Sequence, residues 1–238
     1  LARMDRGSGR YVRAVPFATT RLYWAIRSLG PRRLWARLPR RLQLYLVAVG
    51  VFSAGFAAFW GPLPAYLSGF YADERVFWFF LATNAASAAV FTRVGALSVD
   101  HGARRLQSGA LVARALLFPI VALVVVAVGP PIELPALLAV FGLIGLTWAV
   151  IAVTATGLVT RLAGPARGTA LGLYAAVAGA GGGVGSVLGG WLADAAGYLV
   201  AFLVAGGLVL ASVVVVALVA TGDGEAKGGR AEPADLEG

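Results

Sequence analysis

Six stretches of about twenty mainly apolar residues dominate this chain and limit what it can fold into. A helix needs about 20 such residues to cross a hydrocarbon core about 30 Å thick. The sequence therefore predicts an all-α membrane protein that contacts the lipid bilayer. The expected spans are residues 42–67, 76–98, 107–128, 134–158, 168–192 and 198–220.

The composition excludes several classes of protein. Hydrophobic residues make up 59% of the chain and charged residues only 13%, whereas soluble domains carry about 25% charge. The absence of cysteine excludes disulfides, thiolate metal sites and thiol nucleophiles, and we expect neither a metal nor a cofactor. The net charge of +9 does not predict nucleic-acid binding, because the arginines lie next to apolar spans and no recognition fold accompanies them.

Three regions are expected along the chain. Residues 1–41 predict a basic cytoplasmic linker, in which residues 16–29 form either a short interfacial helix or a plain basic connection. Residues 42–221 form the six-helix transmembrane domain, and residues 222–238 predict a disordered cytoplasmic tail. No signal peptide is visible. The chain begins with Leu1 and Met4 is its only methionine, so we expect a fragment or one half of something longer.

The distribution of arginine predicts the orientation. Residues 1–41 contain eleven arginines, and the connections at 100–105 and 161–167 add two each, which gives fifteen on one side. The opposite connections contain Arg75 alone. Because positive charge is retained in the cytoplasm, both termini are expected there and the protein is expected in the cell membrane.

Prolines and short connections shape the spans. The first span ends in Trp60-Gly61-Pro62-Leu63-Pro64, where the prolines must kink or end the helix. The other spans are separated by short polar turns, which predicts antiparallel neighbours.

The fifth span is rich in small residues. Gly181, Gly185 and Gly189 recur every four positions and form a stripe that lets helix backbones approach closely. The spacing alone does not decide whether this stripe serves transport or only helix packing. A parallel stripe contains Ala178, Gly182, Ser186 and Gly190.

These residues carry a resemblance to a known family. The run Arg167-Gly-Thr-Ala-Leu-Gly-Leu-Tyr174, followed by Gly185-Ser-Val-Leu-Gly-Gly-Trp-Leu-Ala-Asp194, resembles the eleventh helix of major facilitator superfamily transporters. The glycine run is also similar to the antiporter motif of helix five, with Ser186 where that motif has proline. The Pro-ended first span resembles the first helix of a repeat in that family.

The connection between the second and third spans resembles the cytoplasmic loop motif of the same family. Gly95, Gly102 and Arg104 are in register with Gly-x-x-x-Asp-Arg-x-Gly-Arg-Arg, whereas Asp100 falls one position late and Arg105 lies just past the pattern. The two arginines either bind acidic groups and helix carbonyls or only anchor the loop on the cytoplasmic side.

The resemblance implies an architecture and a function. It implies one six-helix half with 3+3 inverted repeats, here the C-terminal half, and a secondary transporter that moves a small solute by alternating access. The implied partners are the N-terminal six-helix half and a small-molecule substrate.

Polar residues inside the spans are the candidates for a substrate cavity. The family implies that the first, second, fourth and fifth spans line this cavity. Each hydroxyl could instead bond to its own helix, whereas an amide is harder to satisfy there. Arg114, inside the third span, either snorkels to the cytoplasmic face or pairs across helices. The candidates are Asn84, Ser87, Trp60, Thr147, Trp148, Thr154 and Tyr174.

Two other functions compete with transport. An intramembrane enzyme needs a nucleophile with a base or two buried carboxylates, but His101 and the acidic residues lie in loops and span ends. The sequence therefore predicts no enzyme. A non-transporting membrane scaffold or receptor would share the topology and stays the alternative.

Overall fold

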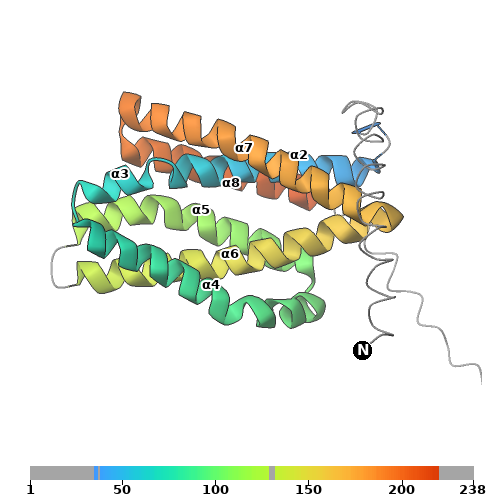
Figure 1. The fold of residues 1–238 in the computed structure, drawn as a ribbon, viewed down its shortest axis with the longest axis horizontal. Coiled ribbons are helices and arrows are strands. Elements are labelled where there is room, and N and C mark those ends of the chain that lie inside the picture. Colours follow the sequence, from blue (N-terminus) through green and yellow to red (C-terminus); the bar gives the residue numbers. More distant parts are fainter. Residues whose placement is uncertain (1–34, 37, 129–131, 220–238) are drawn as a thin grey trace, which may run out of the picture.

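The computed structural model describes residues 35–36, 38–128 and 132–219. All regular secondary structure in these residues is helical (Figure 1). The expected linker, its interfacial helix at 16–29 and the tail at 222–238 lie almost wholly outside the described residues. The helices are α2 (Arg40–Trp60), α3 (Leu63–Ser68), α4 (Asp73–His101), α5 (Ala103–Ala127), α6 (Glu133–Ala163), the 3-10 turn η1 (Gly164–Ala166), α7 (Arg167–Ala196) and α8 (Tyr198–Val219).

Six helical segments in the described residues are long and apolar enough to cross a membrane, and α2 with α3 makes up the first. This confirms the six predicted spans. The helices extend further than predicted, because charged residues continue them beyond the apolar core. Asp73 and Glu74 lie in the first turn of α4 and Arg161 lies in the last turn of α6, where each charge complements the helix dipole.

The first span is interrupted where the prolines predicted. α2 ends at Trp60, and α3 begins at Leu63 after Gly61 and Pro62. Pro64 then lies in the first turn of α3, where its missing N–H costs no helical hydrogen bond.

Three connections turn on a single glycine. Gly102 (φ 80°), Gly164 (φ 54°) and Gly197 (φ 88°) lie directly after α4, α6 and α7, in a backbone region that favours glycine. Residues predicted as loops therefore belong to the helices on either side.

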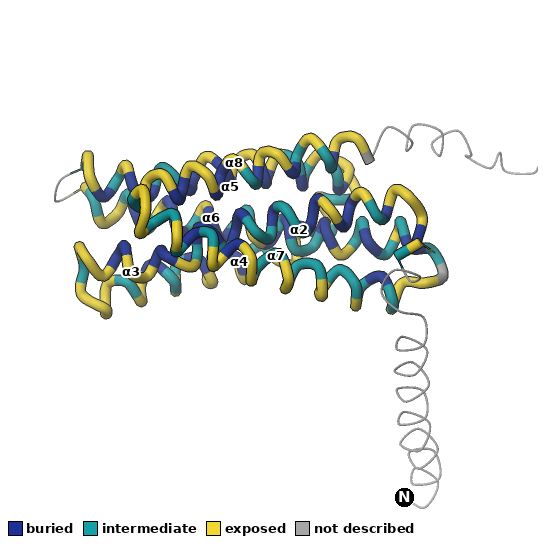
Figure 2. Tube along the Cα trace, turned by 90° about the horizontal axis from the view of Figure 1, so that it is seen from above, coloured by how far each residue is buried: buried dark blue, intermediate teal, exposed yellow. Residues whose placement is uncertain are grey.

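The bundle has three layers. Seen from above, α2 and α6 lie in the middle, α5 and α8 on one side, and α4 and α7 on the other (Figure 2). α2 packs mainly on α7 and α8, whereas α6 packs mainly on α4 and α5, and α5 also packs on α8.

These pairings show an internal repeat. Exchanging α2 with α6, α4 with α7 and α5 with α8 maps the α2–α7 contact onto α6–α4 and the α2–α8 contact onto α6–α5, and it maps the α5–α8 contact onto itself. α2 and α6 run in opposite directions (Figure 1). The first three and last three spans are therefore related as an inverted repeat, as the resemblance implied.

Candidate functional site

Arg114 is the one large charged side chain buried in the described part of the bundle. It lies on α5 and is only 2% exposed. Its Nη1 donates hydrogen bonds to the backbone oxygen of Ile144 (3.0 Å) and to Oγ1 of Thr147 (3.4 Å), both on α6. Arg114 therefore pairs across helices, and the snorkelling alternative is wrong.

Three aromatic rings also lie close to Arg114. Its guanidinium carbon lies 4.5 Å from the ring centre of Phe56, 5.4 Å from Trp148 and 5.8 Å from Phe118. A cation over such faces is attracted by the ring quadrupole, by about 2 kcal/mol when the pair is desolvated. These contacts tie α2, α5 and α6 together around one positive charge.

No carboxylate neutralises this charge within the described residues. The acidic residues there lie at or near helix ends, and the Nε of Arg114 is buried without a hydrogen-bond partner. A buried cation with an unused donor is costly, and in membrane proteins such residues mark functional regions.

Thr147 and Trp148, two predicted cavity residues, meet at this arginine. Thr147 accepts from Arg114 and donates to the backbone oxygen of Ile144 (2.8 Å). Trp148 packs edge-on against Phe56 but keeps 43% of its surface exposed, although α6 lies in the middle layer. Arg114 therefore holds a partly accessible aromatic and a hydroxyl side by side.

A second cluster surrounds Trp60, at the break between α2 and α3. Its ring lies 5.5 Å from Phe80 on α4 and 6.5 Å from Phe141 on α6. Asn84 is exposed, and its Nδ2 donates to the oxygen of Phe80, 2.8 Å away. The amide of Asn84 is thus partly satisfied by its own helix, and its exposed side faces away from the core.

The other predicted cavity residues do not join these clusters. Thr154 is buried and bonds only to its own helix, at Val150 and Ile151. Ser87 is buried on α4, and Tyr174 is half-buried on α7. The whole set remains a prediction.

The glycine stripe of α7 packs against the backbone of α2. A Cβ atom added at Gly181, Gly185 or Gly189 would clash with a backbone oxygen of α2, at Gly50, Ala54 and Ala58 respectively.

The parallel stripe of α7 behaves differently. Ser186 lies near Gly61, but a Cβ added at Gly182 or Gly190 would meet nothing within 4 Å. Only one of the two predicted stripes therefore lies in a tight backbone contact.

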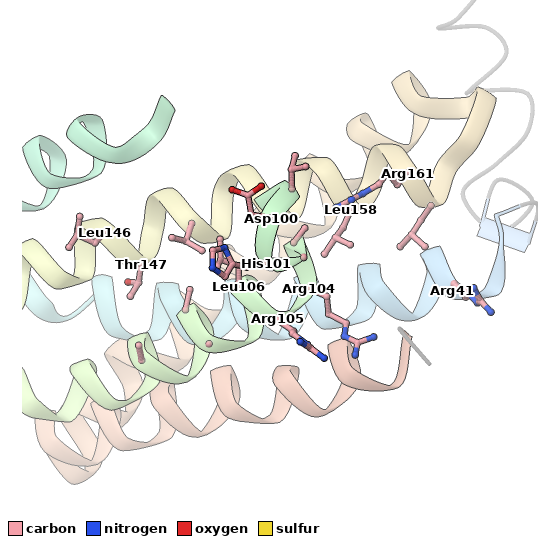
Figure 3. A pocket seen from close by; sticks show the side chains of 18 of the residues that line it. Arg41, Asp100, His101, Arg104, Arg105, Leu106, Leu146, Thr147, Leu158 and Arg161 are labelled. Atoms are coloured by element: carbon pink, nitrogen blue, oxygen red, sulfur yellow. The ribbon is translucent and has the colours of Figure 1, made fainter. Parts of the chain in front are cut away.

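The loop motif lies beside an open groove of about 1360 Å³ at the end of the bundle where α4 meets α5 (Figure 3). Asp100, Gly102, Arg104 and Arg105 line this groove, whereas Gly95 does not. Arg41 from α2 and Arg161 from α6 line it too. We call it the basic groove. The spacing of the motif gave no sign that two other helices would each add an arginine here.

At the opposite end, a hydrogen bond joins the connection after the first span to the first residue of the fourth span, outside the predicted membrane region. The hydroxyl of Tyr71 donates to Oε1 of Glu133. Burial, as the larger cause, and the Glu133 carboxylate, as the smaller one, both raise the pKa of Tyr71. The hydroxyl therefore remains protonated and able to donate. No sequence signal pointed to this pair, because 62 residues separate its members.

Within the described residues, no group of three or more His, Cys, Asp or Glu side chains is placed to hold a metal ion. The side chains gathered at the middle of the bundle are a guanidinium, hydroxyls and aromatic rings, which suit binding of a solute.

The family model of the Major Facilitator Superfamily matches residues 45–236. The chain belongs to this superfamily of membrane transporters, and its six spans fit one six-helix half of that architecture. No curated protein and no solved structure matches the chain significantly.

Proposed function

We propose that this chain is the C-terminal half of a secondary transporter that moves a small solute across the cell membrane by alternating access. Membership of the superfamily supports transport in general. The pair of Thr147 and Trp148 carries the more specific proposal, because a partly exposed ring and a hydroxyl are fixed beside a wholly buried cation.

The uncovered faces of α4 and α7 support a second six-helix half as partner. Of the six spans, these two helices have the smallest share of their residues buried inside the bundle. Large apolar side chains remain exposed on them, including Trp78 and Phe91 on α4 and Val187 and Trp191 on α7. In this fold, alternating access is a rocking of one half against the other around a midplane site.

The solute would meet side chains from several helices. Trp148 and Thr147 on α6 form the centre, and Arg114 acts as the positioning residue that holds both. We place Trp60 and Asn84 at the edge of the same site, and we keep Ser87, Thr154 and Tyr174 as further candidates.

Energy coupling would come from outside this half. The described acidic side chains lie at or near helix ends, and none is at the middle of a span. A proton-coupled carrier generally needs a buried titratable group. If this transporter is driven by protons, its coupling carboxylate belongs to the N-terminal half.

Cysteine labelling tests alternating access, because the chain has no cysteine of its own. Trp148→Cys is introduced into the full-length protein, with any cysteines outside this chain replaced, and probed with an impermeant maleimide in right-side-out and inside-out vesicles. A transporter should expose this position to each side in turn, so labelling is expected in both. Labelling from one side only, or from neither, would favour the scaffold or receptor.

Three control positions accompany this experiment. Leu116→Cys lies on the outer layer and is 55% exposed, so it should face lipid and stay unlabelled. Ala72→Cys should label only from outside and Ala166→Cys only from the cytoplasm, which tests the orientation with both termini cytoplasmic.

A further inference from the structure

The basic groove combines two kinds of surface. Its mouth carries Arg41 on α2, Arg105 on α5 and Arg161 on α6, each from a different helix (Figure 3). Arg104 adds a fourth arginine, and Asp100 is the only acidic residue among the described residues that line the groove. The mouth is therefore strongly positive.

The inner wall of the groove is apolar. α5 contributes Ala110 and Ala113, and α6 contributes Leu146, Val150 and Leu158. Leu146 and Arg161 are separated by about 22 Å along the helix axis, which exceeds the roughly 15 Å of hydrocarbon in one leaflet. Charge thus changes to apolar surface along the direction that crosses the membrane.

We propose that the basic groove binds an anionic phospholipid of the leaflet it faces. The phosphate lies among Arg41, Arg105 and Arg161. Each planar guanidinium group can donate two parallel hydrogen bonds to two oxygens of one phosphate. An acyl chain lies along the wall formed by Val150 and Leu158. A soluble anion would use the mouth but leave this apolar wall without a partner, whereas a lipid matches both.

The groove also reaches the candidate transport site. Thr147 lines its inner end and accepts a hydrogen bond from Arg114. A lipid chain in the groove would pack against the helix face that presents Thr147. Lipid binding itself does not depend on transport, so it can fail or succeed independently of the proposed function.

Native mass spectrometry of the full chain, purified in detergent and mixed with equal amounts of phosphatidylglycerol and phosphatidylcholine, tests the proposal. Phosphatidylglycerol should be retained preferentially. One arginine near an anionic surface contributes roughly a fivefold factor in binding, so the double variant Arg105→Gln/Arg161→Gln should lower this retention by roughly 25-fold. Arg167→Gln is the matched control, because this exposed arginine lies at the same end but outside the groove.

A second variant tests the apolar wall while every arginine is kept. Gly109 lines the groove, and a side chain added there would enter open space, so Gly109→Phe should fill the groove without disturbing the helix packing. Retention of phosphatidylglycerol should fall at least fivefold, with an unchanged unfolding temperature.

Several outcomes would overturn the proposal. The double variant could bind as much phosphatidylglycerol as Arg167→Gln, or phosphatidylcholine could be retained equally well. If Gly109→Phe retained phosphatidylglycerol normally, the preference for this lipid would come from diffuse surface charge and not from the groove. Displacement of the lipid by glycerol phosphate at equal concentration would assign the mouth to a soluble anion.

Discussion

The two repeats of the bundle have the same topology but are held together by different chemistry. In the contact between α2 and α7, three glycines lie against the backbone of the partner helix. In the related contact between α6 and α4, only Gly145 makes such an approach, at Thr83. There, stacking of Phe79 on Phe141 and a hydrogen bond from Thr83 to the oxygen of Phe141 (3.0 Å) complete the interface.

The outer helices differ in the same way. α5 carries the buried Arg114 and Gln107, whereas the only buried polar side chain described on α8 is Ser212, which bonds within its own helix. A fold of this kind constrains where helices cross, but each crossing can be stabilised by dispersion between backbones or by hydrogen bonds and rings. The polar chemistry is concentrated on the α4–α5–α6 side.

The largest expected effect comes from breaking the glycine contact. Gly185→Leu should destabilise the protein towards the upper end of about 1–3 kcal/mol and abolish transport, because the new side chain must displace the backbone of α2 at Ala54. Thermal unfolding and flux in liposomes measure both. Gly182→Leu, three residues away on the same helix, meets open space and should leave unfolding unchanged. Equal unfolding of the two variants would mean that the stripe faces lipid.

The next effect concerns the polar side of the comparison. Arg114→Met keeps the length of the side chain but removes the charge and both hydrogen bonds to α6, so Thr147 and Trp148 lose their support. Solute affinity should fall about tenfold, or about 1.4 kcal/mol, while the protein still folds, because replacing a buried ion by an apolar group is often neutral.

Ser212→Ala on α8 is the control for Arg114→Met and should change neither affinity nor folding. Unchanged transport by Arg114→Met would remove the positioning role of the arginine.

The smallest expected effect comes from removing the hydrogen bond between α4 and α6 while the ring stacking between them is kept. Thr83→Val keeps the shape but loses the bond to Phe141, and such interhelical bonds average about 0.6 kcal/mol. Chemical or thermal unfolding in detergent should resolve this loss. Asn84→Ala, which removes only a bond within α4, should unfold like the parent, and a cost as large as that of Thr83→Val would contradict the distinction.

The sequence predicted what depends on local pattern. Hydrophobic length identified the six spans, Pro62 and Pro64 located the break after Trp60, and the spacing of Gly181, Gly185 and Gly189 indicated a close helix contact. Each of these features is set by residues within a few turns of one another.

What the sequence could not predict depends on which helices meet. Spacing alone could not distinguish the packed stripe from the parallel stripe that contains Gly182 and Gly190, because the small residues of both stripes recur every four positions. Nor could it decide between snorkelling and burial of Arg114, since its partner Ile144 is 30 residues away. The basic groove likewise needs Arg41 and Arg161 to be brought to the same end of the bundle.

The pairing of α2 with the last two helices has a consequence for the order of assembly during synthesis. α2 ends at Trp60, but its main partners, α7 and α8, begin only at Arg167 and Tyr198. At 5–20 residues per second, the ribosome needs roughly 5–20 seconds to reach α7 after finishing α2. During that interval α2 is in the membrane without the helices that bury it. Neither repeat is therefore a self-contained folding unit, and the tertiary structure of the first three spans can close only when the last span has been made.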